Sequence, residues 1–237
     1  EALGMIRADL ARTVPMSRLL EGDVGSGKTV VAVSAMLSMI AAGYQAVLMA
    51  PTELLTRQHF ATIAPLAEAA GVKVALLTGR DSQKQKNETL AGLADGSIPL
   101  VVGTHALVQE DVEFADLALA VVDEQHRFGV TQRMALSSKS HAVDLLAMTA
   151  TPIPRTLMLA AYGDLDVSKL TEKPAGRQPI DTRTVPLERI GEVIDAVGRM
   201  IKTGARVYWV CPLIEESEDI DLANAEERHR LLSARFP

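Results

Sequence analysis

The stretch that most constrains this chain is residues 22–29, Gly-Asp-Val-Gly-Ser-Gly-Lys-Thr. It fits the phosphate-loop pattern, in which a glycine is followed by four residues and then by Gly-Lys and Ser or Thr. Glycines let the backbone curl so that its N–H groups surround phosphate oxygens, and a helix that starts at the end of the loop adds its positive pole. Apolar residues at 18–20 and 30–40 predict the strand that enters the loop and the helix that leaves it.

This loop predicts a site for the phosphates of ATP. Its predicted cofactor-binding residues are Gly22, Asp23, Gly25, Ser26, Gly27, Lys28 and Thr29. The ammonium group of Lys28 would reach the β- and γ-phosphates, and the Thr29 hydroxyl would complete the shell of a Mg²⁺ ion. The alternative is a glycine-rich turn that carries an exposed lysine.

The composition and the order of apolar segments predict an α/β fold. Of 237 residues, 48% are hydrophobic but only 3% are aromatic, so the core must be aliphatic, as buried parallel strands usually are. Strands are expected at 18–20, 45–50, 72–77, 98–102, 117–122 and 143–148, and helices at 5–12, 30–40, 53–70, 82–94, 130–136 and 152–161. This alternation predicts a mostly parallel sheet flanked by helices.

Polar residues follow almost every predicted strand, at the edge where such sheets bind ligands. Asp123 and Glu124 come after one aliphatic strand; in an ATPase the first would hold Mg²⁺ and the second would accept the proton of the attacking water. The alternative is a solvent-facing acidic turn. His126 could link the nucleotide site to its neighbours or be structural, and Thr149 and Thr151 could transmit the nucleotide state or simply cap a helix.

Three further strand ends, at 51–53, 78–80 and 103–105, carry hydroxyls, glycine and isolated basic groups. These groups suit contact with a phosphate backbone without base recognition, although each cluster alone is more often an ordinary loop. The net charge of −6 does not exclude nucleic acid as a partner. Residues 213–227 hold seven carboxylates and no Lys or Arg, which leaves the rest of the chain at +1.

The remaining residues predict a second, incomplete α/β unit. Residues 173–179 have the composition of a linker, and strands at 180–185 and 206–211, a helix at 190–201 and a terminal helix from about 222 follow. Because the sequence starts at Glu1 and stops at Pro237, we expect it to be a piece of a longer protein. The single cysteine, Cys211, favours a reducing compartment, and the apolar run 30–43 is too short to span a bilayer, so we expect a cytoplasmic protein without a membrane partner.

Five runs appear in the order found in superfamily-two helicases, which the sequence therefore resembles. They are residues 22–29, 50–54 (Ala-Pro-Thr-Glu-Leu), 103–105 (Gly-Thr-His), 123–130 (Asp-Glu-Gln-His-Arg-Phe-Gly-Val) and 149–156 (Thr-Ala-Thr-Pro-Ile-Pro-Arg-Thr). The resemblance implies a RecA-like P-loop NTPase domain. It places motor lobe 1 at 1–172, a linker at 173–179 and the N-terminal part of lobe 2 at 180–237.

The resemblance also implies roles for the residues that match its motifs. Lys28, Asp123 and Glu124 would be catalytic, Thr29 and Asp123 would hold the metal, and His126, Thr149 and Thr151 would couple hydrolysis to movement. The backbone of DNA would be contacted by Thr52, Arg80, Thr104 and His105. The implied enzyme is a bacterial, nucleoid-associated and monomeric ATP hydrolase that remodels stalled forks and Holliday junctions in recombination and repair.

Three alternatives stay open at this point: a transcription-repair coupling translocase, a non-catalytic nucleotide-dependent interaction module, and a P-loop enzyme such as a kinase that acts on a small molecule. The sequence lacks the motifs V and VI of the second lobe, the last of which would supply arginines to the γ-phosphate. We therefore expect this stretch on its own to hydrolyse ATP slowly.

Overall fold

A computed structural model describes residues 1–123, 139, 142–151, 165–172, 180–211 and 225–236. The chain divides into two compact units, residues 1–177 and 178–237. Their assignment to two motor lobes stays a prediction.

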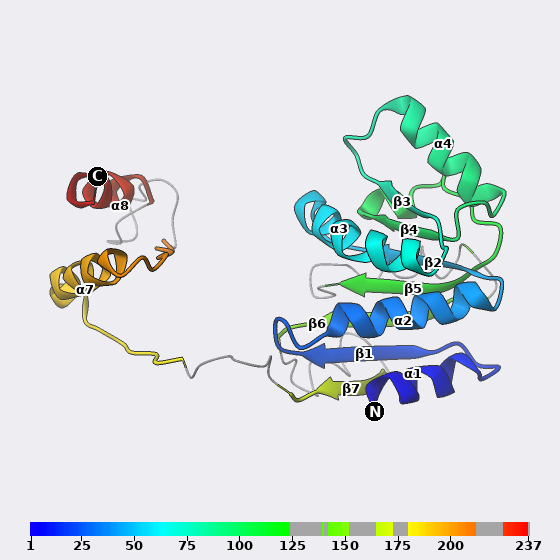
Figure 1. The fold of residues 1–237 in the computed structure, drawn as a ribbon, viewed down its shortest axis with the longest axis horizontal. Coiled ribbons are helices and arrows are strands. Elements are labelled where there is room, and N and C mark those ends of the chain that lie inside the picture. The colour runs from blue at the N-terminus through cyan, green and yellow to red at the C-terminus, as the bar shows by residue number, and fades with distance from the viewer. Residues whose placement is uncertain (124–138, 140–141, 152–164, 173–179, 212–224, 237) are drawn as a thin grey trace. The chain divides into compact units, whose positions relative to one another are not determined.

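The first unit is built on a seven-stranded sheet whose order is β3-β4-β2-β5-β6-β1-β7. The strands are β1 (Ser17–Gly22), β2 (Gln45–Met49), β3 (Val74–Leu77), β4 (Leu100–Gly103), β5 (Leu117–Asp123), β6 (Asp144–Thr149) and β7 (Asp166–Leu170). Every pairing between neighbours is parallel, and the arrows of β1, β5 and β7 point the same way in Figure 1. The predicted parallel α/β fold is therefore confirmed, and the carboxyl ends of all the strands lie along one edge.

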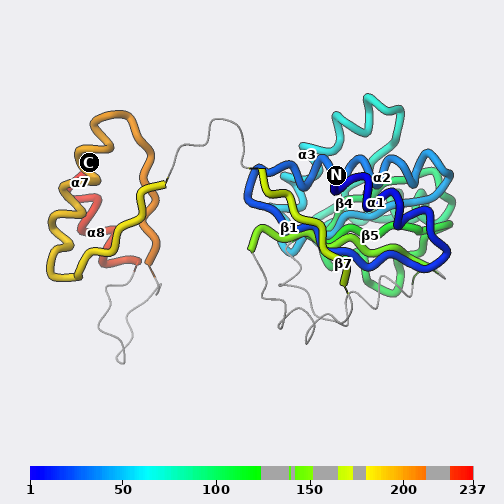
Figure 2. The backbone as a smooth tube through the Cα atoms, turned by 90° about the horizontal axis from the view of Figure 1, so that it is seen from below, coloured from blue at the N-terminus to red at the C-terminus, as the bar shows by residue number. Residues whose placement is uncertain are grey.

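Helices α1 (Ala2–Leu10), α2 (Lys28–Ala41) and α3 (Glu53–Ala69) cover one face of this sheet, as the edge-on view in Figure 2 shows. Helix α4 (Gln83–Ala94) and the short 3₁₀ helix η1 (His105–Val108) contribute to the core on the other face. Strands β2, β4 and β5 are buried along their whole length, because both of their faces are covered.

Strand β7 was not predicted from the sequence. It extends the sheet beyond β1, where Leu170 lies opposite Gly22. Its central residue, Ser168, is buried and accepts a hydrogen bond of 2.9 Å from the guanidinium of Arg18 in β1. The same guanidinium forms an ion pair of 2.7 Å with Asp9 of α1. One buried cation thus ties α1, β1 and β7 together.

The second unit differs from its prediction. Helix α7 (Ile190–Lys202) forms as expected after a short 3₁₀ turn, η3 (Leu187–Arg189), and α8 (Ala225–Arg235) also forms. The strands predicted at 180–185 and 206–211 are wrong, since neither segment pairs with any strand of the described residues. An extended segment becomes a strand only when a partner satisfies its backbone groups.

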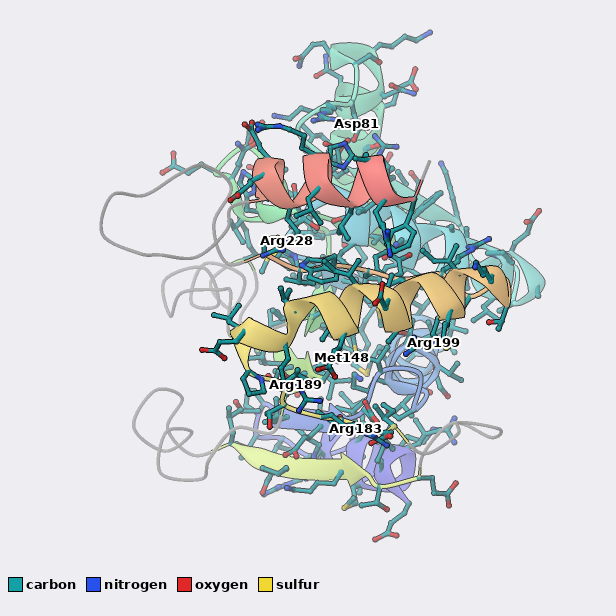
Figure 3. All side chains as sticks on the ribbon, turned by 90° about the vertical axis from the view of Figure 1, so that its left-hand side faces the viewer. Asp81, Met148, Arg183, Arg189, Arg199 and Arg228 are labelled. Atoms are coloured by element: carbon teal, nitrogen blue, oxygen red, sulfur yellow. The ribbon has the colours of Figure 1, made fainter. Side chains whose placement is uncertain are left out.

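Helices α7 and α8 pack against each other. Asp195 of α7 accepts a hydrogen bond of 3.0 Å from Arg235, and a Cβ on Gly198 would lie 2.9 Å from the ring of Phe236. Arg228, labelled in Figure 3, lies with its guanidinium 5.5 Å from the centre of the Trp209 ring. This cation–π contact joins α8 to the extended segment that precedes it in the chain.

Candidate active site

The phosphate-loop residues form a tight turn between the end of β1 and the start of α2. Gly25 and Gly27 adopt φ angles of +80° and +95°, in the left-handed region that other residues rarely enter. Gly22 is required for a different reason: a Cβ there would lie 2.6 Å from Ser26 Oγ and 2.9 Å from the Cβ of Leu170. The glycines therefore set the shape of this turn.

Lys28 reaches back over the loop from the first position of α2. Its Nζ donates to the backbone carbonyl oxygens of Gly22 at 2.5 Å and Asp23 at 2.9 Å, which holds the ammonium group against the loop. No side chain caps α2, and its first turn contains no acidic residue. The positive pole of the helix and the lysine charge are thus directed at the same place, an arrangement suited to binding a phosphate.

Ser26 adds a further polar group to the loop. Its Oγ is buried and has no hydrogen-bond partner among the described residues. A buried hydroxyl without a partner is costly for the fold alone, and a ligand oxygen or a water molecule can satisfy it. Thr29 follows in the first turn of α2 and is partly buried.

Asp123 ends the buried strand β5 and is itself only 8% exposed. Its Oδ2 lies 2.6 Å from Nε2 of His59, which projects from α3. Taken alone, the side chains of Asp123 and His59 are each 12% exposed, so both are largely shielded from solvent. His59 was not among the residues predicted from the sequence.

Strand β6 separates Asp123 from the phosphate loop, and its end carries Thr149 and Thr151. In register, Asp123 lies opposite Met148, and Glu21 of β1 lies opposite Thr149. The two threonine hydroxyls are 3.0 Å apart, and the Thr149 hydroxyl also accepts the Thr151 backbone N–H at 3.2 Å. Among the described residues, the hydroxyls of Thr149 and Thr151 therefore bond within this short segment. The other predicted residues of this site, Glu124 and His126, lie outside the described residues.

The predicted DNA-contacting residues follow the three neighbouring strands β3, β4 and β2. Thr52 is exposed and caps α3 by accepting the Leu55 N–H at 3.3 Å. The side chain of Arg80 is 84% exposed and forms an ion pair of 3.1 Å with Glu53, so the turn after β3 contacts the first residue of α3. His105 is exposed, whereas Thr104 is buried and its hydroxyl accepts the Ala106 N–H in a cap of η1.

The profile of the DEAD/DEAH box helicase family matches residues 10–159 of this chain. The chain belongs to this family. Membership of this helicase family implies the use of ATP, in agreement with the geometry of the loop. The match ends before β7 and the second unit, so it covers strands β1 to β6 of the sheet.

Individual members of the DEAD/DEAH box helicase family are similar over almost the whole chain. The ATP-dependent DNA helicase RecG of Acidithiobacillus ferridurans is 49% identical over 98% of this chain and 34% of its own length. The RecG of Escherichia coli is 46% identical, again over 98% of this chain and 34% of its own length. The chain thus spans about a third of the length of these curated relatives.

A solved structure described as RecG bound to a three-way DNA junction superposes with a TM-score of 0.72 at 43% identity, over 86% of this chain and 28% of that one. The RecA-like α/β architecture expected for a DEAD/DEAH box helicase is therefore confirmed for this chain. Among the described residues, no helix is long and apolar enough to cross a membrane.

One sequence signal could have drawn attention to His59. It lies four residues before the apolar Ile63 and eight before Ala67, a spacing that puts all three on one side of a helix, and both apolar residues are buried in the structure. This spacing places His59 toward the sheet. It does not identify Asp123 as its partner, because that depends on the order of the strands.

Proposed function

We propose that this chain is the nucleotide-binding part of an ATP-driven DNA helicase or translocase that acts on branched DNA, with Mg²⁺ as the companion of ATP. The observation that carries this proposal is the joint placement of the uncapped start of α2, Lys28 and the Asp123 carboxylate along one edge of the sheet. The RecG relatives and the junction-bound RecG structure support DNA as the substrate.

The oxygen atoms of the site fit a magnesium ion. Mg²⁺ prefers hard oxygen ligands and is usually held by a few protein groups together with phosphate oxygens and water. Asp123 offers a carboxylate and Thr29 a hydroxyl. When bound, the ion would neutralise charge on the phosphates and orient them for attack by water.

The protein groups have distinct roles in this proposal. Lys28 holds the phosphates, the loop N–H groups surround them, and Glu124 accepts the proton of the attacking water. Residues Thr149 and Thr151 at the end of β6, together with His126, couple the state of the nucleotide to movement. The parent protein acts as a monomer in the bacterial cytoplasm, in association with the nucleoid.

The DNA backbone is contacted beyond β2, β3 and β4. Arg80 and His105 offer exposed basic groups at this edge, and Thr52 offers an exposed hydroxyl. Thr104 contributes through the position of its backbone, because its side chain is buried and caps η1. Such contacts hold a duplex without reading its bases.

ATP turnover by a form of the protein that contains this whole chain, measured with and without a three-way DNA junction, tests the proposal. We expect strong stimulation by the junction, abolished in Lys28→Ala, while Lys28→Ala still binds the junction. Arg80→Ala should instead weaken junction binding and reduce its salt dependence. Turnover that ignores DNA in the unsubstituted protein would contradict the proposed substrate.

A further inference from the structure

The contact between His59 and Asp123 links a helix to the proposed metal-holding carboxylate. Their side-chain atoms Nε2 and Oδ2 are 2.6 Å apart, and both side chains are largely shielded from solvent. An ionised carboxylate can only accept hydrogen bonds, so the imidazole must donate from Nε2 to it. No other described residue forms a hydrogen bond with the Asp123 carboxylate.

Helix α3 is fixed at several points before it reaches this contact. Thr52 caps its first turn, and the hydroxyl of Thr56 donates to the Thr52 carbonyl at 2.9 Å and lies 3.4 Å from the carbonyl oxygen of Gly103 at the end of β4. Farther along, Ile63 and Ala67 are fully buried against the sheet. The imidazole is therefore presented from a rigid element.

We propose that His59 is a positioning residue that orients Asp123 for Mg²⁺. By holding Oδ2, His59 fixes the rotation of the carboxylate and leaves Oδ1 for the ion or for a water in its shell. Hydrogen bonds of this kind orient metal-binding side chains, and their loss typically lowers metal affinity about 10- to 100-fold. The inference rests on the proposed role of Asp123 as the group that holds Mg²⁺.

The same contact ties the two parts of the sheet edge together. Helix α3 is capped by Thr52 in the proposed DNA-contacting region and contacts Asp123 through His59. One helix therefore connects that region to the proposed metal-holding carboxylate.

Binding of a fluorescent ATP analogue, titrated with Mg²⁺, tests this role without requiring hydrolysis. His59→Leu removes the donor, and His59→Gln keeps an N–H at a similar reach from the backbone. We expect His59→Leu to raise the Mg²⁺ concentration for half-saturation about tenfold, with His59→Gln close to the unsubstituted protein. Affinity for the analogue without Mg²⁺ should be the same in all three, because the phosphate loop is unchanged.

Two controls separate positioning from general damage to α3. Thr62→Ala alters an exposed residue of the same helix and should have no effect on the Mg²⁺ dependence. In an Asp123→Asn background, His59→Leu should add nothing further, since the group it positions is gone. Should His59→Leu fold poorly, His59→Asn serves instead, because its shorter amide does not reach Asp123.

The proposal is overturned if a folded His59→Leu protein needs no more Mg²⁺ than the unsubstituted protein. It is equally overturned if His59→Gln needs as much Mg²⁺ as His59→Leu, because restoring an N–H donor would then have no effect. A different result, in which Mg²⁺ has no effect on analogue binding by the unsubstituted protein, would remove the proposed metal site itself.

Discussion

The two edges of the sheet use their polar groups differently. At the amino edge, Gln45 bonds the carbonyl oxygens of Leu93 and Ile98 and the N–H of Asp116, each at 2.9 Å. At the carboxyl edge, the buried hydroxyls of Ser26 and Thr78 have no hydrogen-bond partner among the described residues. The buried polar side chain at the amino edge is thus paired within the fold, whereas two buried hydroxyls at the carboxyl edge lack a partner among the described residues and fit the proposed binding of a ligand there.

The largest effect should come from Lys28→Ala at the carboxyl edge. Loss of a charged donor to phosphate should weaken binding of an ATP analogue about 100-fold, while the free energy of unfolding changes by less than about 1 kcal/mol. Fluorescence titration and urea unfolding measure the two quantities. Lys73→Ala, at an exposed lysine before β3, is the matched control. Unchanged affinity in Lys28→Ala would break the contrast between the edges.

Gln45→Leu should show the opposite pattern at the amino edge. The substitution leaves the carbonyl oxygens of Leu93 and Ile98 without their side-chain donor in a buried place, which should cost about 2–3 kcal/mol of stability. The folded fraction should bind the ATP analogue normally. Urea unfolding measures the loss, with the exposed Gln83→Ala on α4 for comparison. A Gln45→Leu protein that is stable but binds nucleotide poorly would argue against the proposed difference between the two edges of the sheet.

Thr52→Ala sharpens the comparison, since Thr52 lies at the carboxyl edge but uses its hydroxyl within the fold. Loss of the cap on α3 should lower stability by about 1 kcal/mol. Thr52→Ser keeps the cap and should retain most of the stability. Thermal unfolding of both proteins provides the measurement; equal losses in the two would mean that the methyl group, rather than the hydroxyl, is important.

The smallest effect should come from Asp144→Asn. Burial raises the pKa of Asp144 in the folded state, although its hydrogen bond from the Met16 N–H opposes the shift. A raised pKa means that ionisation weakens the native state, so this contribution to stability is present at low pH and is lost as the pH rises through the folded pKa. Asparagine keeps the acceptor without the charge.

Asp144→Asn should therefore be more stable than the unsubstituted protein at pH 7, by less than about 1 kcal/mol, with the difference vanishing below the ordinary pKa of aspartate. Urea unfolding at several pH values measures this. A gain that persists unchanged in acid would show that the charge is not its cause.

Features with local signals were predictable from the sequence. The phosphate loop, the cap at Thr52 and the aliphatic strands each depend on residues close in the chain, and the structure has all of them. Strand β7 was missed because Asp166–Leu170 is short, and its partner β1 is far away in the sequence. Segments 180–185 and 206–211 have the alternation of strands, but pairing depends on a neighbour that no local pattern reveals.

The residues of the candidate site also differ in whether a local sequence signal identifies them. Lys28 and Asp123 were singled out because a glycine loop and a strand end identify them locally, and their roles stay predictions. The partnership of His59 with Asp123 could not be predicted, because it joins residues 64 positions apart in the sequence through the order of β2 and β5 in the sheet.

Strand β7 also determines how mechanical load would enter this sheet. The backbone leaves the sheet after Leu170, which is in register with Gly22, the first residue of the phosphate loop. Tension on the chain beyond this point pulls β7 lengthwise along β1, so several hydrogen bonds resist together rather than opening one after another. Because β7 pairs with the strand that enters the phosphate loop, a pull on the chain beyond Leu170 would be borne first by the hydrogen bonds between β7 and β1.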